Sequence, residues 1–135
     1  MVISDSTNLQ QFNRELDRAT KKIKGDIQKF IKLVCLETFK RFIMRTAVQT
    51  GRARGNWQVE VNRAALGEVD ESLWNRVFEI GAAKLAQIPP FSVIHITNNV
   101  EYVYYLEYVR RSKQHPEGMV EITLVEMKTW LAGIK

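Results

Sequence analysis

Residues 7–47, TNLQQFNRELDRATKKIKGDIQKFIKLVCLETFKRFIMRTA, decide the fold because their apolar side chains recur every three or four positions. The recurring residues are Phe12, Leu16, Ala19, Ile23, Ile27, Phe30 and Val34. That spacing places one apolar stripe along an α-helix. We therefore expect a long amphipathic helix over about 7–47, which would be about 60 Å long if unbroken, with Gly25 as a weak point or a kink.

Polar residues at the start of this segment fit a helix N-terminus. Thr7 and Gln10 have the spacing of a capping box, and Ser4, Asp5 and Ser6 are alternative caps. A cap is expected here because its side-chain oxygen accepts a hydrogen bond from a free backbone N–H of the first turn.

A short motif ends the helix. Thr50–Trp57, TGRARGNW, places two arginines between two glycines, which indicates a helix stop followed by a tight loop. After it, Trp57, Val59 and Val61 alternate with polar residues, as in a half-buried strand. The polar residues 62–71 predict a loop.

Two further elements follow that loop. Ser72 is placed to cap a helix that runs to Leu85 and is ended by Pro89-Pro90. The sequence SVIHIT, residues 92–97, predicts a second strand, with Asn98-Asn99 as its turn.

The C-terminal part contains one clear helix and one ambiguous segment. Residues 101–108 have helical spacing at Tyr102 and Leu106. In GMVEITLVEMKTWLAGIK, residues 118–135, the apolar spacing fits a short strand that turns into a helix, or a helix throughout after Pro116. The predicted fold is α+β, a single domain over 1–135, in which the long N-terminal helix is followed over 50–135 by shorter helices packed on a small, mostly antiparallel sheet.

Composition excludes several classes of protein. The chain has 135 residues, 45% of them hydrophobic and 26% charged, which is typical of an ordinary globular domain. No apolar run of about 18 residues predicts a membrane span, and MVISDSTNLQQF lacks the layout of a signal peptide. The single cysteine, Cys35, excludes an internal disulfide and a multi-cysteine zinc site, and its apolar neighbours predict a buried thiol. We expect a protein made and used in a reducing cytosol, or in something assembled there.

Catalytic and metal-binding patterns are missing from the sequence. His95 and His115 have no His, Asp or Glu at ligand spacing. The sequence GRARG lacks the Lys-Ser/Thr ending of a phosphate-binding loop, and no Ser or Cys stands in a nucleophile context. The carboxylates are scattered rather than paired for acid–base work. We therefore expect no enzyme, no metal and no cofactor.

The net charge of +5 is unevenly distributed. Residues 1–55 carry 12 Lys/Arg against 5 Asp/Glu, a net of +7, whereas residues 56–135 carry 8 against 10, a net of −2. Such asymmetry suits contact with nucleic acid or with an acidic protein surface, and it is also compatible with an ordinary solvated helix face. A basic nucleic-acid-binding module is therefore one candidate function.

Arg52 and Arg54 have two possible roles. In a loop between two glycines they can grip phosphate, or they can pair with carboxylates inside the fold or across a subunit boundary. We favour carboxylate pairing, with Glu107 as the candidate partner, and we expect Trp57 to anchor the loop in the core.

Residues 98–108, NNVEYVYYLEY, are unusually rich in tyrosine. Tyr102, Tyr104, Tyr105 and Tyr108 surround a short helix on all sides, and a small core cannot bury so many rings. Tyrosine is favoured where one end of a side chain is apolar and the other is wet, so we expect some of these rings to face a partner.

The order of these motifs resembles the small neck and tail-completion proteins of long-tailed bacteriophages, the lambdoid "tail component" virion-morphogenesis family. The resemblance spans about residues 46–125. Its first block contributes Thr50, Gly51, Arg52, Arg54, Gly55 and Trp57. Its later part contributes Thr97, Asn98, Asn99, Tyr102, Leu106, Glu107, Tyr108, Ser112, Gln114, Pro116, Gly118, Met119 and Val120. The chain departs from the family pattern at Ala47, Gln49, Glu101, Val109 and His115.

The resemblance implies a structural virion protein of the head–tail junction that acts without catalysis. Members of this family form rings, and six copies are expected by analogy with the symmetric tail. The implied partners are copies of the chain and head-connector, tail-terminator or tail-tube proteins, with channel DNA as a possible further contact of the basic helix. The tyrosines, Asn98-Asn99 and the KQHPEGMV segment, residues 113–120, would supply framework and inter-subunit surface. Assembly would take place in the host cytoplasm, and no membrane is implied.

Overall fold

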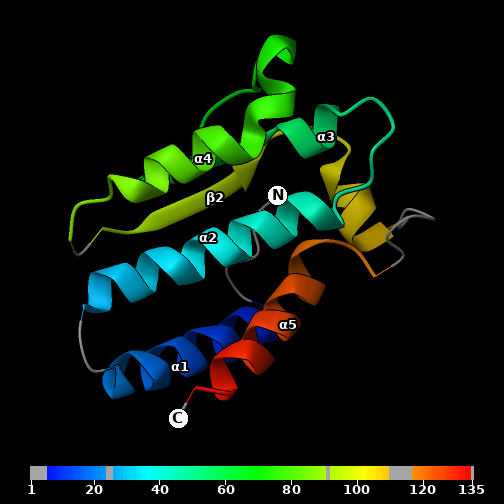
Figure 1. The fold of residues 1–135 in the computed structure, drawn as a ribbon. Coiled ribbons are helices and arrows are strands. Elements are labelled where there is room, and N and C mark those ends of the chain that lie inside the picture. Colours follow the sequence, from blue (N-terminus) through cyan, green and yellow to red (C-terminus); the bar gives the residue numbers. More distant parts are fainter. Residues whose placement is uncertain (1–5, 24–25, 91, 110–116, 135) are drawn as a thin grey trace.

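The structure, a computed structural model of the chain, describes residues 6–23, 26–90, 92–109 and 117–134 and confirms an α+β fold. Its elements in chain order are α1 (Thr7–Lys22), α2 (Ile27–Arg45), α3 (Arg52–Gly55), β1 (Trp57–Val61), the 3₁₀-helix η1 (Glu71–Arg76), α4 (Val77–Ala86), β2 (Ile94–Asn98), the π-helix η2 (Tyr105–Val109) and α5 (Val120–Ala132). Figure 1 shows α2 in the middle, with α1 and α5 on one side of it and β2 and α4 on the other.

The expected long N-terminal helix is two helices. α1 ends at Lys22, and α2 begins at Ile27 with Asp26 as its N-cap, whose carboxylate accepts a hydrogen bond from the N–H of Lys29 at 3.2 Å. The two helices run in opposite directions (Figure 1). The expected start and end of the helical region are close to those observed. The prediction of one continuous helix is wrong, because Asp26 begins a new helix.

Ser6 caps α1. Its hydroxyl oxygen accepts a hydrogen bond from the N–H of Leu9 at 3.2 Å, so the alternative cap is confirmed and the capping box at Thr7 is wrong. The hydroxyl of Ser6 also donates to Glu121 of α5 at 2.8 Å, which fastens the start of α1 to the start of α5.

The sheet consists of β1 and β2, which pair antiparallel as predicted, with Trp57 opposite Asn98 and Val61 opposite Ile94. Trp57 and Val59 are buried, and the ring of Trp57 lies 5.0 Å from that of Phe42 on α2. The alternating apolar side chains of β1 therefore form the face that packs on the central helix.

The predicted helix over 72–85 begins as η1 and continues as α4. Asp70, not Ser72, is its cap: the Asp70 carboxylate accepts from the N–H of Ser72 at 3.0 Å and from its hydroxyl at 2.6 Å. These two hydrogen bonds stabilise the charged carboxylate and lower the pKa of Asp70 below its usual range.

The ambiguous C-terminal segment is a helix throughout, α5. Leu124, Met127 and Leu131 lie on its buried face, at the helical spacing that the sequence allowed. α1 lies along α5, so the first and last helices of the chain pack together (Figure 1). The prediction of a short strand here is wrong, because the buried residues of this segment are spaced by three and four, as on one face of a helix, and not by two.

Candidate interaction surface

The TGRARGNW segment folds into the short helix α3, which packs closely against η1. Gly55 is buried against Trp74, and a Cβ atom added at Gly55 would lie 2.3 Å from the Cβ of Trp74. No real side chain fits in that space, so position 55 requires glycine. The second glycine of the motif thus allows close packing of two helices.

The two residues after Gly55 tie three parts of the chain together. The buried Asn56 side chain donates to the carbonyl of Arg52 at 2.8 Å and accepts from the N–H of Val69 at 2.6 Å. The indole N–H of Trp57 donates to the hydroxyl of Thr46 at 2.7 Å. Trp57 therefore anchors this loop in the core, as predicted.

Arg52 forms the predicted kind of ion pair with a different partner. Its Nε and Nη2 each lie 2.8 Å from a carboxylate oxygen of Glu68, in a bidentate pair that lowers the pKa of Glu68. The guanidinium also lies over the ring of Tyr102, 5.6 Å from its centre. The prediction that Glu107 pairs with Arg52 is therefore wrong.

Arg54 pairs with no carboxylate among the described residues. Its Nε and Nη2 donate to the carbonyl of Thr46, the C-cap of α2, at 3.1 and 2.8 Å. Carbonyls at a helix C-terminus lack intrahelical partners and carry partial negative charge, which an arginine neutralises well. The expected carboxylate pairing inside the fold is thus confirmed for Arg52, whereas Arg54 binds a backbone carbonyl instead.

Asn98 and Asn99 are framework residues. The buried Asn98 amide donates to the carbonyl of Ala53 at 2.8 Å, which joins the end of β2 to α3. The Asn99 amide donates to the carbonyls of Ala65 and Gly67, both at 2.9 Å. Asn98 therefore fixes α3 against the sheet, and Asn99 fixes the loop over 62–70.

Glu107 caps α5. Its Oε2 accepts from the N–H groups of Met119 and Val120 at 2.8 and 2.9 Å, and its Oε1 accepts from the N–H of Glu121 at 3.0 Å. These N–H groups begin the helix, where the dipole favours a negative charge. Gly118 has φ +83°, which favours glycine, and a Cβ there would lie 3.2 Å from three oxygens of Glu107, so a larger residue would have to push this carboxylate away. Pro116 lies outside the described residues.

Three tyrosines of the same region form an exposed patch, which we call the aromatic cluster: Tyr104, Tyr105 and Tyr108, which are 51%, 56% and 41% exposed. The ring of Tyr104 lies 5.2 Å from that of Tyr108 and 6.3 Å from that of Tyr105. Partial burial and nearby carboxylates raise the pKa of Tyr108, so its hydroxyl stays protonated at neutral pH. Tyr102, by contrast, is half-buried against the core.

Several cations of the N-terminal region act inside the fold. Arg18 donates to the carbonyls of Leu131 and Ile134 at the end of α5, at 2.7 and 3.1 Å. Lys32 donates at 3.0 Å to the carbonyl of the last residue of α4. Together with Arg54, they cap the C-termini of three helices. Such caps need no formal negative charge, which explains part of the positive excess.

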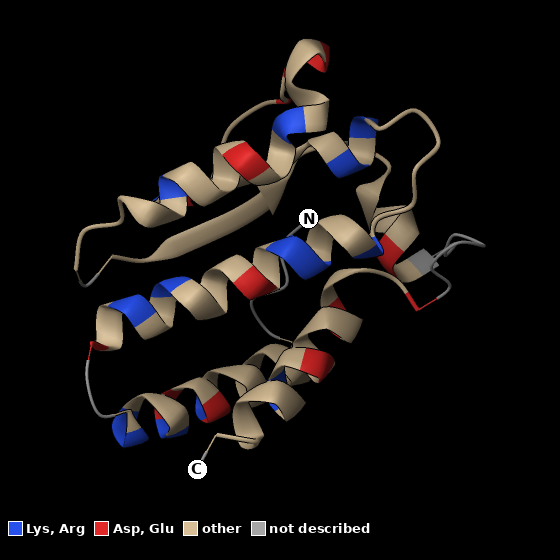
Figure 2. Cartoon of the chain, viewed as in Figure 1, with Lys and Arg blue, Asp and Glu red and all other residues tan. Residues whose placement is uncertain are grey.

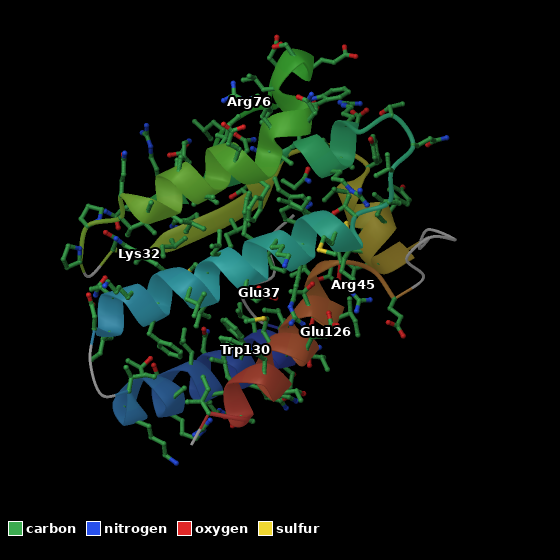
Figure 3. All side chains as sticks on the ribbon, viewed as in Figure 1. Lys32, Glu37, Arg45, Arg76, Glu126 and Trp130 are labelled. Carbon is green, nitrogen blue, oxygen red and sulfur yellow. The ribbon has the colours of Figure 1, made fainter. Side chains whose placement is uncertain are left out.

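Ion pairs between α2 and α5 use further arginines. Glu126 Oε2 lies 2.6 Å from Arg45 Nη2 and 3.7 Å from Arg41 Nη1, and Arg41 also binds Glu37 at 3.0 Å. Figure 3 shows Glu37, Arg45 and Glu126 on one side of the molecule, and Figure 2 shows acidic residues interspersed with the basic ones on α1 and α2. Within the described part of residues 1–55, the cations without an ion pair or a carbonyl partner are Arg14, Lys21, Lys22, Lys29 and Lys40.

An open cavity of about 720 Å³ lies between α1, α2, α5 and β2. Its lining is mostly apolar and includes no Lys, Arg, Asp or Glu among the described residues. Cys35 lines it, and burial raises the pKa of that thiol to about 11, so the thiol is protonated at neutral pH. Sequence reasoning missed this cavity because the apolar stripe that lines it has the same pattern as core residues.

Other features bear on the class of site. The described residues contain no group of three or more His, Cys, Asp or Glu placed to bind a metal ion. His95 is half-buried in β2, and His115 lies outside the described residues. No described helix is both long and apolar enough to cross a membrane. The surface features that stand out are therefore the aromatic cluster and the apolar cavity.

Comparison with known proteins finds no relative. No family model, no curated protein and no solved structure matches this chain. The resemblance to neck and tail-completion proteins therefore rests on the motif residues, and it stays a prediction.

Proposed function

We propose that this chain is a structural protein of a bacteriophage head–tail junction. In this proposal it is a neck or tail-completion protein, and six copies form a ring between the head connector and the tail. It acts by binding neighbouring proteins and catalyses no reaction. It would then be found in the virion, after synthesis and assembly in the host cytoplasm.

The aromatic cluster is the observation that carries the proposal. Its three tyrosines are exposed, yet their short helix is held in place because Glu107, 1% exposed, caps α5. Tyrosine rings add large contact area at low cost in conformational entropy, and they are enriched in protein interfaces. A ring requires two different patches on each subunit, and the cluster is suited to be one of them.

The motif residues support the same proposal in a different way. Gly55, Trp57, Asn98 and Gly118 all make contacts within the chain that position neighbouring segments. A family signature made of such residues describes a shared framework rather than a catalytic centre. The proposal therefore assigns partner binding to the exposed tyrosines and framework roles to the motif.

A basic nucleic-acid-binding module is the alternative. Arg18, Lys32 and Arg54 cap helices, and Arg41, Arg45 and Arg52 form ion pairs, so fewer cations remain for phosphate. A module that binds DNA through many phosphates would lose affinity steeply as salt rises. Tight, steeply salt-dependent binding of duplex DNA by the purified protein would favour this alternative.

A genetic experiment tests the proposal. The gene for this chain would be interrupted by a stop codon in the virus that encodes it, and the products would be examined by electron microscopy. We expect filled heads and separate tails that do not join, and we expect purified protein to restore joined particles. Normal infectious particles without the protein would contradict the proposal.

A further inference from the structure

One edge of β2 is free, and the apolar cavity runs along it. All five residues of β2, Ile94–Asn98, line the cavity. Successive side chains of a strand point to opposite faces, so a cavity on one face would meet only every second residue. A cavity that meets five consecutive residues therefore lies along the edge of the strand.

The hydrogen-bond register shows which residues of β2 are bonded to β1. The N–H of Asn62 donates to the carbonyl of Val93 at 2.7 Å, just beyond the paired residues. In an antiparallel pair, residues that exchange backbone hydrogen bonds alternate with residues that do not. His95 and Thr97, which are two and four residues after Val93, therefore bond to β1.

The backbone groups of Ile94 and Ile96 point the other way, toward the cavity. No second strand pairs with β2 in the described part of the chain, so these N–H and C=O groups have no strand partner there. An unpaired strand edge is a template for another strand. A compact apolar ligand would cover the cavity walls but leave these groups unpaired, whereas an extended backbone supplies donors and acceptors at the required spacing.

The cavity walls define the side chains that such a strand would carry. Phe12 and Leu16 of α1 and Val34 of α2 face the cavity, and no charged Lys, Arg, Asp or Glu of the described residues lines it. An uncharged segment with apolar residues at alternate positions matches these walls. In a second copy the free edge of β2 lies in the same kind of cavity, flanked by its own α1 and α2, so it cannot approach this edge as a bare extended arm can.

We propose that the free edge of β2 binds an extended, uncharged arm of a different protein as a third strand. The arm would bond to the backbone of Ile94 and Ile96 and place its alternate apolar side chains against α1 and α2. This surface is separate from the aromatic cluster, and the proposal holds whether or not the chain belongs to a virus particle.

Amide hydrogen exchange, measured by NMR on the full chain, tests the proposal. The probe is the capped heptapeptide Thr-Val-Thr-Ile-Thr-Val-Thr. Without peptide, the amides of Ile94 and Ile96 should exchange at least about 10-fold faster than those of His95 and Thr97. Saturating peptide should slow amide exchange at Ile94 and Ile96 by about 10-fold or more. The exchange rates of His95 and Thr97 should stay within about twofold of their values without peptide.

Two controls separate strand pairing from apolar binding. A peptide with the same side chains, N-methylated at the residues that would face β2, should protect neither amide, because each methyl group replaces a donor and keeps the peptide backbone too far from β2 for its carbonyls to accept. Leu66, 90% exposed at the cavity rim, gives a variant with little cost to folding: Leu66→Asp should weaken peptide binding by about 10-fold. The matched variant Leu33→Asp, at an exposed position of α2 that does not line the cavity, should leave binding unchanged.

Three results would overturn the proposal. The first is equal protection by both peptides, and the second is no protection by either at about 1 mM, where even weak pairing would register. The third is slow exchange of Ile94 and Ile96 in the protein alone, which would mean that the edge is already covered. Light scattering would then identify the occupant: a mass of 15.7 kDa indicates the chain itself, and twice that mass indicates a second copy.

Discussion

Along one short helical segment, Glu107 is 1% exposed whereas Tyr105, two residues earlier, is 56% exposed. Glu107 satisfies three backbone N–H groups of α5, while the ring of Tyr105 contacts another exposed ring. One side of the segment therefore stabilises the fold, and the other side is exposed and free to contact a partner. The comparison teaches that a short helix anchored by one buried side chain can hold aromatic rings in water, because the fold does not depend on burying them.

The cations show the same contrast. Arg54 caps α2 through two hydrogen bonds, whereas Lys40, also from the basic part of the chain, is exposed without an ion pair among the described residues. Their equal formal charge says nothing about this difference. Local geometry decides which charges stabilise the fold and which remain for partners.

The largest effect is expected when Glu107 is removed. Glu107→Ala leaves three N–H groups at the start of α5 without their acceptor, in a buried site, and should lower the free energy of unfolding by about 4 kcal/mol. Glu107→Gln keeps one acceptor oxygen and should cost less, about 2 kcal/mol. Urea unfolding followed by circular dichroism would measure both, and a loss below about 1 kcal/mol for Glu107→Ala would contradict the framework role.

Gly118→Ala is expected to be the next most damaging change. It adds a left-handed φ penalty and pushes a methyl group against the oxygens of Glu107, for a combined loss of about 2–3 kcal/mol. Gly67→Ala is a matched control, because Gly67 also has positive φ, +73°, but nothing lies within 4 Å of an added Cβ. The control should lose about 1 kcal/mol in thermal or urea unfolding. Equal losses at the two positions would show that the approach of Glu107 does not matter.

Arg54→Met should have a smaller effect. It removes two hydrogen bonds to the C-cap of α2 while keeping an apolar stem, and should cost about 1 kcal/mol of stability. Lys40→Met, which removes an unpaired charge of the described region, should change stability by less than about 0.5 kcal/mol. Chemical unfolding of the two variants side by side would decide whether cations at helix ends differ from solvated ones.

Tyr105→Ser is expected to have the smallest effect on stability and a large effect on assembly. Its ring is mostly in water, so the free energy of unfolding should change by less than about 0.5 kcal/mol. Complementation of particle assembly should nevertheless drop by about 10-fold, if the ring is buried in an interface. A variant that assembles normally would remove Tyr105 from the proposed surface.

Much of the fold was predictable from the sequence, because the apolar periodicities of β1 and α4 reflect burial directly, whereas the spacing in α5 fitted a strand as well as a helix. The division between α1 and α2 was harder to predict. The apolar stripe continues across it, and Gly25 is compatible with a kink as well as with a break. Asp26, a residue type that often caps helices, was the signal for a new helix that the sequence analysis missed.

The site was predictable in its residue types but not in its partners. Glu107 was singled out as a partner for an arginine, yet it binds backbone N–H groups that carry no sequence signature. Arg52 pairs with Glu68, which stands in a loop without regular spacing. The free edge of β2 depends on which elements lie next to it in space, and periodicity within a strand does not report that.

Hydroxyl-radical footprinting of the tyrosines, read by mass spectrometry, tests the central claim most directly. The free protein and purified virus particles would be compared under the same dose. We predict that Tyr104, Tyr105 and Tyr108 are oxidised readily in the free protein and are protected in the particles. Equal oxidation in both states, or absence of the chain from the particles, would contradict the account.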